Sequence, residues 1–293
     1  MKAVVITSHG GPEVLQLQDV DDLLLIQDDE VLIKVEATAL NGADTEQRKG
    51  IYPAPNGASP YLGLECSGTI QAVGKNVSRW RIGDQVITFK FSFCLWVSIC
   101  YLLESMLEFM LLFQVCALLS GGGYAEKVVV PAGQVLPIPA NISVKDASCF
   151  PEVACTVWST VFMTSKLSAG ETFLIHGGSS GIGTFAIQIA KYYGIKVFVT
   201  AGSEEKLAFC KGIGADICIN YKTEDFVARV KEETQGKGVD VILDNIGAAY
   251  FQQNINCLNF NGRLFIIGFM GGTVTELNIT SLFAKRLTVQ CKL

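Results

Sequence analysis

Residues 173–194 read Phe-Leu-Ile-His-Gly-Gly-Ser-Ser-Gly-Ile-Gly-Thr-Phe-Ala-Ile-Gln-Ile-Ala-Lys-Tyr-Tyr-Gly, and this stretch decides the fold. An apolar strand runs into a glycine-rich turn, and the apolar positions after the turn recur at helical spacing. A strand, a glycine-rich turn and a helix in this order are typical of a backbone that binds a dinucleotide pyrophosphate at the helix N-terminus. A glycine-rich loop without a ligand is the alternative. We predict cofactor binding at Gly178, Ser180, Gly181, Ile182 and Gly183.

Strands and helices alternate from about residue 144 onward, after a β-rich first part. The predicted strands are Thr172–Ile175, Lys196–Thr200, Asp216–Asn220, Val239–Asp244 and Arg263–Gly268, with helices at Thr184–Tyr193, Glu204–Lys211, Glu224–Glu233 and Ala249–Leu258. This alternation predicts an α/β fold with a doubly wound parallel sheet. The first part has strand-like runs at Ala3–Ile6, Glu30–Ala37 and Gly68–Gly74, punctuated by Gly and Pro as in a small barrel. We expect one domain at residues 1–130 and a nucleotide-binding domain at 131–293.

Composition narrows the class of protein. The chain has 293 residues, of which 49% are hydrophobic and 17% charged, so it can bury large cores. A net charge of -5 without a run of Lys or Arg argues against nucleic-acid binding. The ten cysteines are scattered without a Cys-x-x-Cys pair, and no export signal opens the chain. We therefore expect a reducing, cytoplasmic location.

Residues 86–114 interrupt this plan with an apolar run that carries one lysine and two glutamates. The run is long enough for a membrane-spanning helix, although the glutamates make insertion costly. It is also framed by a repeated Gln-Val, at Gln85-Val86 and Gln114-Val115, as an in-frame retained intron would be. Three explanations stay open: a retained intron or misassigned exon, a functional insertion, and a membrane anchor.

Several further motifs occur in combination outside the apolar run. They are Ala39–Asp44, Gln47–Pro53, Leu62–Gly68, Gly121–Glu126, Phe150–Trp158, Gly202–Lys206, Ala215–Lys222 and Leu243–Gly247. With the glycine turn, these motifs resemble the zinc-independent quinone oxidoreductases of the medium-chain dehydrogenase/reductase superfamily, in particular the p53-inducible quinone oxidoreductase group. The resemblance implies a GroES-like β-barrel catalytic domain, a Rossmann domain, NADPH as hydride donor and usually a homodimer.

The chain departs from that family at its end as well as at the apolar run. Members continue past the position of Leu287–Gln290 with a helix and strands that return to the barrel, whereas this chain stops at Leu293. We therefore expect a C-terminally truncated Rossmann domain that lacks the return to the barrel. An exposed apolar run and a missing segment together predict that the chain is poorly soluble or inactive.

The resemblance also bears on metal binding and catalysis. Asn41 and Leu64 stand where zinc-dependent relatives carry a Cys and a His as zinc ligands. Zinc needs nitrogen or sulfur donors in a tetrahedral set, and the chain has only two histidines and no cysteine cluster. We expect no metal, so hydrogen bonds must polarise a substrate carbonyl, and the resemblance offers Tyr52 and Asn41 as catalytic residues. For Tyr52, packing beside Pro53 and Pro55 is the alternative.

Cofactor choice is encoded at the tip of the second Rossmann strand, Ala201-Gly202-Ser203, which lacks the acidic residue that binds the ribose 2′-hydroxyl of NAD. Ser203, with Lys206 one helical turn on and Tyr221 after the next strand, can hold a 2′-phosphate. The two glutamates after Ser203 act against a phosphate, yet they suit the first turn of a helix that Ser203 caps. The pattern favours NADPH over NADH.

The remaining candidates line the nicotinamide half of the site. Asn245, Gly268 and Phe269 follow strand ends where such sheets bind ligands. Thr156 matches a family position beside the nicotinamide ring, and a hydrogen bond to its own helix is the alternative. Because the sequence contains no evident catalytic triad, acid–base pair or metal set, we expect hydride transfer to a quinone or a similar conjugated electrophile. The alternatives are an enoyl-thioester or alkenal reductase, a membrane-tethered reductase, and a nucleotide-binding protein without activity.

Overall fold

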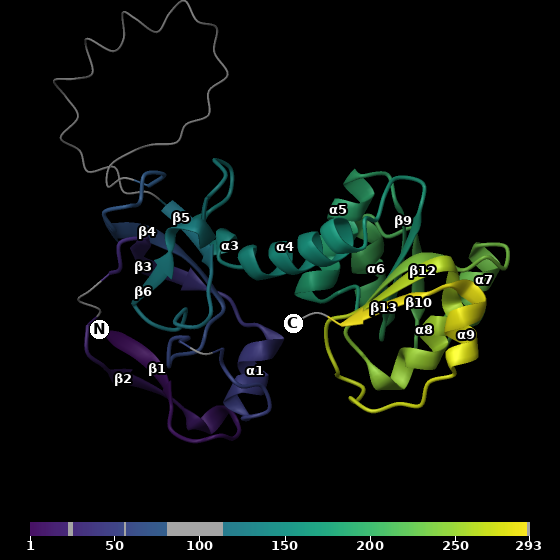
Figure 1. The fold of residues 1–293 in the computed structure, drawn as a ribbon, viewed down its shortest axis with the longest axis horizontal. Coiled ribbons are helices and arrows are strands. Elements are labelled where there is room, and N and C mark those ends of the chain that lie inside the picture. The colour runs from purple at the N-terminus through teal and green to yellow at the C-terminus, as the bar shows by residue number, and fades with distance from the viewer. Residues whose placement is uncertain (23–25, 56, 81–113, 292–293) are drawn as a thin grey trace, which may run out of the picture. The chain divides into compact units, whose positions relative to one another are not determined.

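The computed structural model describes residues 1–22, 26–55, 57–80 and 114–291, which form two compact units, Met1–Glu152 and Val153–Leu293 (Figure 1). The apolar run 86–114 and the three explanations for it lie outside the described residues, apart from Gln114, which begins a strand. The domain boundary predicted after residue 130 falls within strand β6 (Lys127–Pro131), inside the first unit. The division into a catalytic and a nucleotide-binding domain at that residue stays a prediction.

The first unit is built on a five-stranded antiparallel sheet of order β6-β3-β4-β5-β7. Its strands are β3 (Glu30–Thr38), β4 (Glu65–Val73), β5 (Gln114–Leu118), β6 and β7 (Val135–Pro137), and a separate two-stranded sheet pairs β1 (Lys2–Ile6) with β2 (Leu15–Asp19). Val31 and Ile33 of β3 are both fully buried in the core of this unit. Their spacing is the two-residue period of a strand with one face on a core, and the expected β-rich first part is confirmed.

Short helices complete the first unit. They are α1 (Gly42–Arg48), α3 (Val144–Ala147) and the 3₁₀ turns η1 (Pro12–Val14) and η2 (Ala132–Gln134). α1 begins at Asn41, whose backbone N–H donates to the Asp44 carboxylate at 2.8 Å. This contact places a predicted catalytic residue at the N-cap of a helix.

The second unit contains a six-stranded parallel sheet of order β10-β9-β8-β11-β12-β13. The strands are β8 (Thr172–His176), β9 (Lys196–Ala201), β10 (Ile217–Asn220), β11 (Val239–Asp244), β12 (Leu258–Ile266) and β13 (Thr288–Cys291). Counted from β8, the order is that of the doubly wound dinucleotide-binding sheets, in which the strand order reverses between β8 and β11 while all strands stay parallel. The predicted fold class is confirmed.

Helices cover both faces of this sheet (Figure 1). The helical segments from residue 151 onward are α4 (Pro151–Val157), the π-helix η3 (Trp158–Thr164), α5 (Gly181–Tyr192), α6 (Glu204–Gly212), α7 (Phe226–Glu233), the 3₁₀ turn η4 (Ala248–Tyr250), α8 (Phe251–Cys257) and α9 (Ile279–Lys285). Phe173 and Ile175 of β8 pack in one core cluster with α5 and α6, whereas Leu174 packs in a second cluster with α7 and α8. A strand buried on both faces explains the continuous apolar run in the sequence.

Predicted and observed elements differ mainly at their ends. β11 has the predicted bounds, but β12 begins at Leu258 and ends at Ile266, so Gly268 lies in the loop beyond it. The single helix predicted at Ala249–Leu258 was wrong in its start, because the chain first forms the 3₁₀ turn η4. Within the described residues, no helix has both the length and the apolar character needed to cross a membrane.

Candidate functional site

The glycine-rich turn joins β8 to α5 and leaves one stretch of backbone open. Ser180 caps the helix, since its hydroxyl accepts a hydrogen bond from the Gly183 N–H at 3.0 Å. Gly183 packs tightly, because a Cβ there would lie 2.5 Å from the Gly177 carbonyl oxygen. Gly181 is open by contrast, with Val153 Cγ1 at 3.5 Å as the nearest atom to such a Cβ. The first N–H groups of a helix have no partner inside that helix. In α5 the first of them lie where the backbone is open, at Gly181.

Two other residues of the turn have packing roles. A Cβ at Gly178 would lie 2.8 Å from Val199 Cβ, so glycine is needed there for contact with β9. The side chain of Ile182 packs against the core cluster beneath α5. Both residues hold the turn in place, and any contact of theirs with a ligand would be through the backbone.

Ser203, Tyr221 and Lys222 gather at the tip of β9. Ser203 caps α6, with its hydroxyl 3.4 Å from the Lys206 N–H that donates to it. A Cβ at Gly202 would lie 2.6 Å from the Tyr221 hydroxyl and 3.2 Å from Lys222 Cε. Lys222 is not among the residues expected from the sequence, although its position next to Tyr221, just after β10, could have indicated it.

Of the two glutamates that follow Ser203, Glu204 is engaged in a hydrogen bond and Glu205 is exposed. Glu204 accepts a hydrogen bond from Asn220 Nδ2 at 2.7 Å through its Oε1. Lys206 is exposed and makes no salt bridge with any residue that the structure describes. The tip of β9 therefore carries Lys222 and the hydroxyl groups of Ser203 and Tyr221, with Lys206 in the first turn of α6, and these donors suit a phosphate.

Asn245 lies beside the glycine-rich turn and carries a buried acceptor. Its Nδ2 would lie 2.9 Å from a Cβ at Gly177, and its Oδ1 is buried without a hydrogen-bond partner among the described residues. Its carbonyl oxygen would lie 3.0 Å from a Cβ at Gly268, which brings the loop with the exposed Phe269 next to it. A buried acceptor without a donor is costly, so a ligand that supplies a donor would be favoured here.

Thr156, the last predicted cofactor residue, lies in α4 and is partly buried. Its carbonyl oxygen accepts a 3.4 Å hydrogen bond from the Ser159 hydroxyl. Both the proposed contact with the nicotinamide and a hydrogen bond within the helix are compatible with this position, so the role of Thr156 stays a prediction.

In the first unit, Asn41 is bound to a buried carboxylate. Asn41 Nδ2 donates to Glu65 Oε1 at 2.9 Å, and the other carboxylate oxygen of Glu65 accepts from the Glu152 N–H at 2.9 Å. Burial raises the pKa of Glu65 above its usual value, against the opposing effect of these two hydrogen bonds. An amide nitrogen carries two N–H groups, so Asn41 has one beyond its bond to Glu65.

A second buried carboxylate holds the backbone of Asn41. Asp44 Oδ2 accepts from the Asn41 N–H at 2.8 Å and from the Tyr124 hydroxyl at 2.9 Å, while its Oδ1 accepts from the Gly63 N–H at 3.1 Å. Burial, and then the Asp44 carboxylate, raise the pKa of Tyr124, which keeps this hydroxyl a donor. Asn41 is thus held through its side chain by Glu65 and through its backbone by Asp44, and neither carboxylate was expected from the sequence.

Tyr52 follows α1, and its N–H donates to the Glu46 carbonyl oxygen at 3.3 Å. Its hydroxyl makes no hydrogen bond to another residue of the described part of the chain. The structure therefore does not join Tyr52 to Asn41 by a direct hydrogen bond. Among the described side chains, no group of three or more His, Cys, Asp or Glu is arranged to hold a metal ion.

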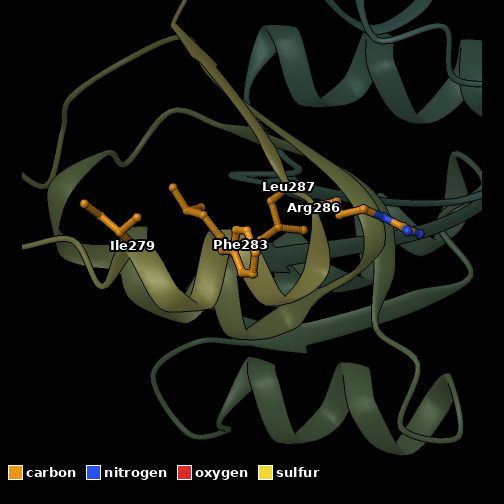
Figure 2. A pocket seen from close by; sticks show the side chains of 5 residues that line it. Ile279, Phe283, Arg286 and Leu287 are labelled. Atoms are coloured by element: carbon orange, nitrogen blue, oxygen red, sulfur yellow. The ribbon is translucent and has the colours of Figure 1, made fainter.

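A hollow of about 610 Å³ lies on α9, lined by Ile279, Leu282, Phe283, Arg286 and Leu287 (Figure 2). Ile279 and Phe283 are 72% and 84% exposed, so this is an apolar surface and not an enclosed cavity. No residue predicted to bind a cofactor or to act in catalysis lines it. Each unit thus holds its own candidate cluster, the glycine-rich turn with its neighbouring loops in the second unit and the residues around Asn41 in the first.

Comparison with known proteins finds a matching family for each unit. Residues 27–140 match the alcohol dehydrogenase GroES-like domain family, and residues 181–291 match the zinc-binding dehydrogenase family. The quinone oxidoreductase of Sus scrofa is 31% identical over 272 residues, an alignment that covers 92% of this chain and 74% of that protein. The chain belongs to the quinone oxidoreductase family of medium-chain dehydrogenases/reductases. It is therefore an oxidoreductase of this family.

Solved structures of the family are similar over the whole chain. Quinone oxidoreductase of Escherichia coli, solved in complex with NADPH, has a TM-score of 0.82 and 28% identity, with 100% of this chain and 81% of that chain covered. The CurK enoyl reductase has a TM-score of 0.80 and 25% identity, with 100% of this chain and 80% of that chain covered. Quinone reductases and enoyl reductases thus share this architecture.

Proposed function

We propose that this oxidoreductase of the quinone oxidoreductase family uses NADPH to reduce quinones or similar conjugated electrophiles. The observation that carries the proposal is the open backbone at Gly181, at the start of a helix capped by Ser180. A helix N-terminus with accessible N–H groups binds a pyrophosphate well. The NADPH complex of the Escherichia coli relative supports the same cofactor here. When bound, NADPH would supply the hydride.

The residues at the tip of β9 fit the extra phosphate of NADPH. Ser203, Lys206, Tyr221 and Lys222 offer hydroxyl and ammonium donors, and the Glu204 carboxylate is bound to Asn220 instead of facing a ribose. Charge-assisted hydrogen bonds to phosphate are stronger than neutral ones. This donor set favours NADPH over NADH.

The loop residues near Asn245 fit the nicotinamide half. The buried Oδ1 of Asn245 requires a donor, and a carboxamide N–H₂ could supply one. Gly268 and Phe269, which lie beside Asn245, would border the ring, with Thr156 as a further contact. Each of these residues would orient the ring and exclude water from it.

We infer that the substrate carbonyl is polarised by hydrogen bonds and not by zinc. Asn41 keeps an N–H for a ligand, and Glu65 and Asp44 fix its orientation. Tyr52 would serve as a second donor and as the source of the proton that the reduced product needs. The position of Leu64, where zinc-dependent relatives carry a His, supports a mechanism without metal, although one matching family is described as zinc-binding.

Steady-state turnover tests the substrate class. The full chain is assayed with NADPH and either a naphthoquinone or a crotonyl thioester, after treatment with a chelator. The proposal expects quinone reduction that survives chelation, with the larger kcat/KM for the quinone. Such turnover would overturn the expectation from the sequence that the chain is poorly soluble or inactive. Loss of activity on chelation would contradict the metal-independent mechanism, and a larger kcat/KM for the thioester would favour the alternative.

An enoyl-thioester or alkenal reductase is the second candidate. The similarity to the CurK enoyl reductase supports it, because that protein has the same architecture at 25% identity. NADPH binding without turnover of either substrate would instead indicate a nucleotide-binding protein without activity. A homodimer and a cytoplasmic location stay proposals, and the first is tested by sedimentation of the full chain.

A further inference from the structure

His176 ends β8 immediately before the glycine-rich turn and is almost completely buried, with 2% of its surface exposed. Its ring packs edge-on against Phe226 and Tyr250, with centroid distances of 5.0 Å to each. His176 is not among the residues predicted to bind the cofactor or to act in catalysis. A buried imidazole among aromatic rings needs hydrogen-bond partners, and these partners lead to two loops of the candidate site.

The hydrogen bonds around His176 fix where its proton lies. Asn254 Nδ2 donates to Asp244 Oδ2 at 3.1 Å, which turns Asn254 Oδ1 toward His176 Nε2 at 2.7 Å. Because an amide oxygen only accepts, Nε2 must carry the hydrogen. His176 Nδ1 then accepts from the Thr200 hydroxyl at 3.0 Å. The four side chains form one hydrogen-bond network, in which Thr200 donates to His176, His176 to Asn254, and Asn254 to Asp244.

At one end of this hydrogen-bond network, Thr200 holds the glycine-rich turn. The Thr200 carbonyl oxygen accepts from the Gly178 N–H at 3.0 Å, while the Thr200 hydroxyl binds His176. Thr200 therefore contacts the residues on both sides of Gly177. Since Thr200 itself is fixed in β9, a change in its side chain would alter how the turn leaves the sheet.

The other end holds the loop after β11. The Asp244 carboxylate accepts from the Ile246 N–H at 2.7 Å and from the Gly247 N–H at 3.2 Å. Asn245 lies in sequence between Asp244 and these two residues, and its side chain lies beside Gly177. The two loops that would hold the two halves of a dinucleotide are thus connected through buried side chains.

We propose that Thr200, His176, Asn254 and Asp244 are positioning residues that keep the glycine-rich turn and the Asn245–Gly247 loop at the spacing one dinucleotide requires. This inference rests on the proposed NADPH binding. Buried polar networks often stabilise a fold no better than apolar side chains of the same size, so stability alone does not account for this one. A ligand that contacts both loops depends on their spacing, whereas a ligand that contacts one loop does not.

The test compares two ligands by isothermal titration with the full chain. NADPH spans both loops, and 2′,5′-ADP occupies only the adenosine half. Thr200→Val removes the hydroxyl with little change of shape, and loss of one buried hydrogen bond predicts about a fivefold rise in the NADPH dissociation constant. The dissociation constant of 2′,5′-ADP should stay within about twofold of the original value.

Two further variants control this experiment. Thr160 is fully buried with no partner for its hydroxyl among the described residues, so Thr160→Val repeats the substitution outside the network and should leave both dissociation constants unchanged. Thr200→Ser restores the hydroxyl and should recover tight NADPH binding. A purely structural network would lower the stability of Thr200→Val without changing the ratio of the two dissociation constants.

The outcomes separate the two proposals. An unsubstituted chain that fails to bind NADPH contradicts the proposed function, whereas equal NADPH binding by the unsubstituted chain and Thr200→Val contradicts only the positioning role. If Thr200→Val does not fold, the ¹⁵N spectrum of His176 in the unsubstituted chain still tests the network. The Nε2–H tautomer supports it, and the Nδ1–H tautomer would overturn it.

Discussion

The two units form their polar sites in different ways. In the second unit the candidate phosphate site is local backbone, in which Gly181 and Gly183 follow the N-cap Ser180 directly. In the first unit Asn41 is held by Glu65, which is 24 residues away in the chain, and Glu65 in turn binds the N–H of Glu152, 87 residues away. A site made of neighbouring backbone is encoded by a short motif, whereas a site made of distant side chains exists only after the chain has folded.

The largest expected effect tests how far the backbone site depends on glycine. Gly183→Ala places a Cβ at 2.5 Å from the Gly177 carbonyl oxygen, so we expect a loss of about 3 kcal/mol in the free energy of unfolding. Gly181→Ala adds the same atom with 3.5 Å of clearance, and its unfolding free energy should change by at most about 0.5 kcal/mol. Urea denaturation measures both, and equal losses would show that the turn is not packed as described.

The next effect is the pH dependence of the free energy of unfolding, which differs between the buried groups His176 and Asp244. Burial lowers the pKa of His176 to about 4 from 6.5, so its contribution to stability is complete above pH 6.5 and is lost as the pH falls toward 4. Burial raises the pKa of Asp244 to about 6 from 3.8, so this group has the opposite effect and stability rises as the pH falls through the same range. Each shift corresponds to about 3 kcal/mol, and the two largely cancel in the unsubstituted chain.

Single substitutions should separate these two contributions. Relative to the unsubstituted chain, Asp244→Asn should become less stable between pH 6 and pH 4, whereas His176→Gln should become more stable between pH 6.5 and pH 4. Tyr250, which packs against His176, titrates well above this range because burial raises its pKa. Unfolding free energies that change in parallel with pH in both variants would contradict the assignment.

Catalysis should depend on the first unit and cofactor affinity on the second. Asn41→Ala removes the proposed carbonyl donor, so kcat with a quinone should fall about 100-fold while the NADPH dissociation constant stays unchanged. Asn76→Ala, an exposed asparagine of the same unit, is the matched control and should retain full kcat. If Asn41→Ala weakens NADPH binding and leaves kcat intact, the division of roles between the units is wrong.

The smallest expected effect concerns cofactor choice. Lys222→Ala removes a cation at the tip of β9, so the dissociation constant for NADPH should rise about tenfold and that for NADH should not change. Lys237→Ala removes another exposed lysine, one that lies away from this tip, and should leave both values as they are. A parallel change for NADPH and NADH would show that Lys222 does not bind the 2′-phosphate.

The same contrast explains which features the sequence could predict. The strand, turn and helix around Gly181 follow from local patterns of apolar residues and glycine, and the parallel sheet follows from alternating strands and helices. Glu65 and Asp44 gave no such signal, because a carboxylate beside an apolar strand is normally solvated and only tertiary contacts bury it. The network through His176 was equally hidden, since it joins residues of β8, β9, β11 and α8.

Hydrogen–deuterium exchange of the full chain with and without NADPH tests the central claim most directly. If a pyrophosphate binds at the start of α5, the amide hydrogens of Gly181 and Ile182 should exchange at least about tenfold more slowly when NADPH is present. The amides of β3, far from the turn in sequence and in a different unit, provide the internal control. Unchanged exchange at Gly181 and Ile182 under saturating NADPH would contradict cofactor binding at this turn.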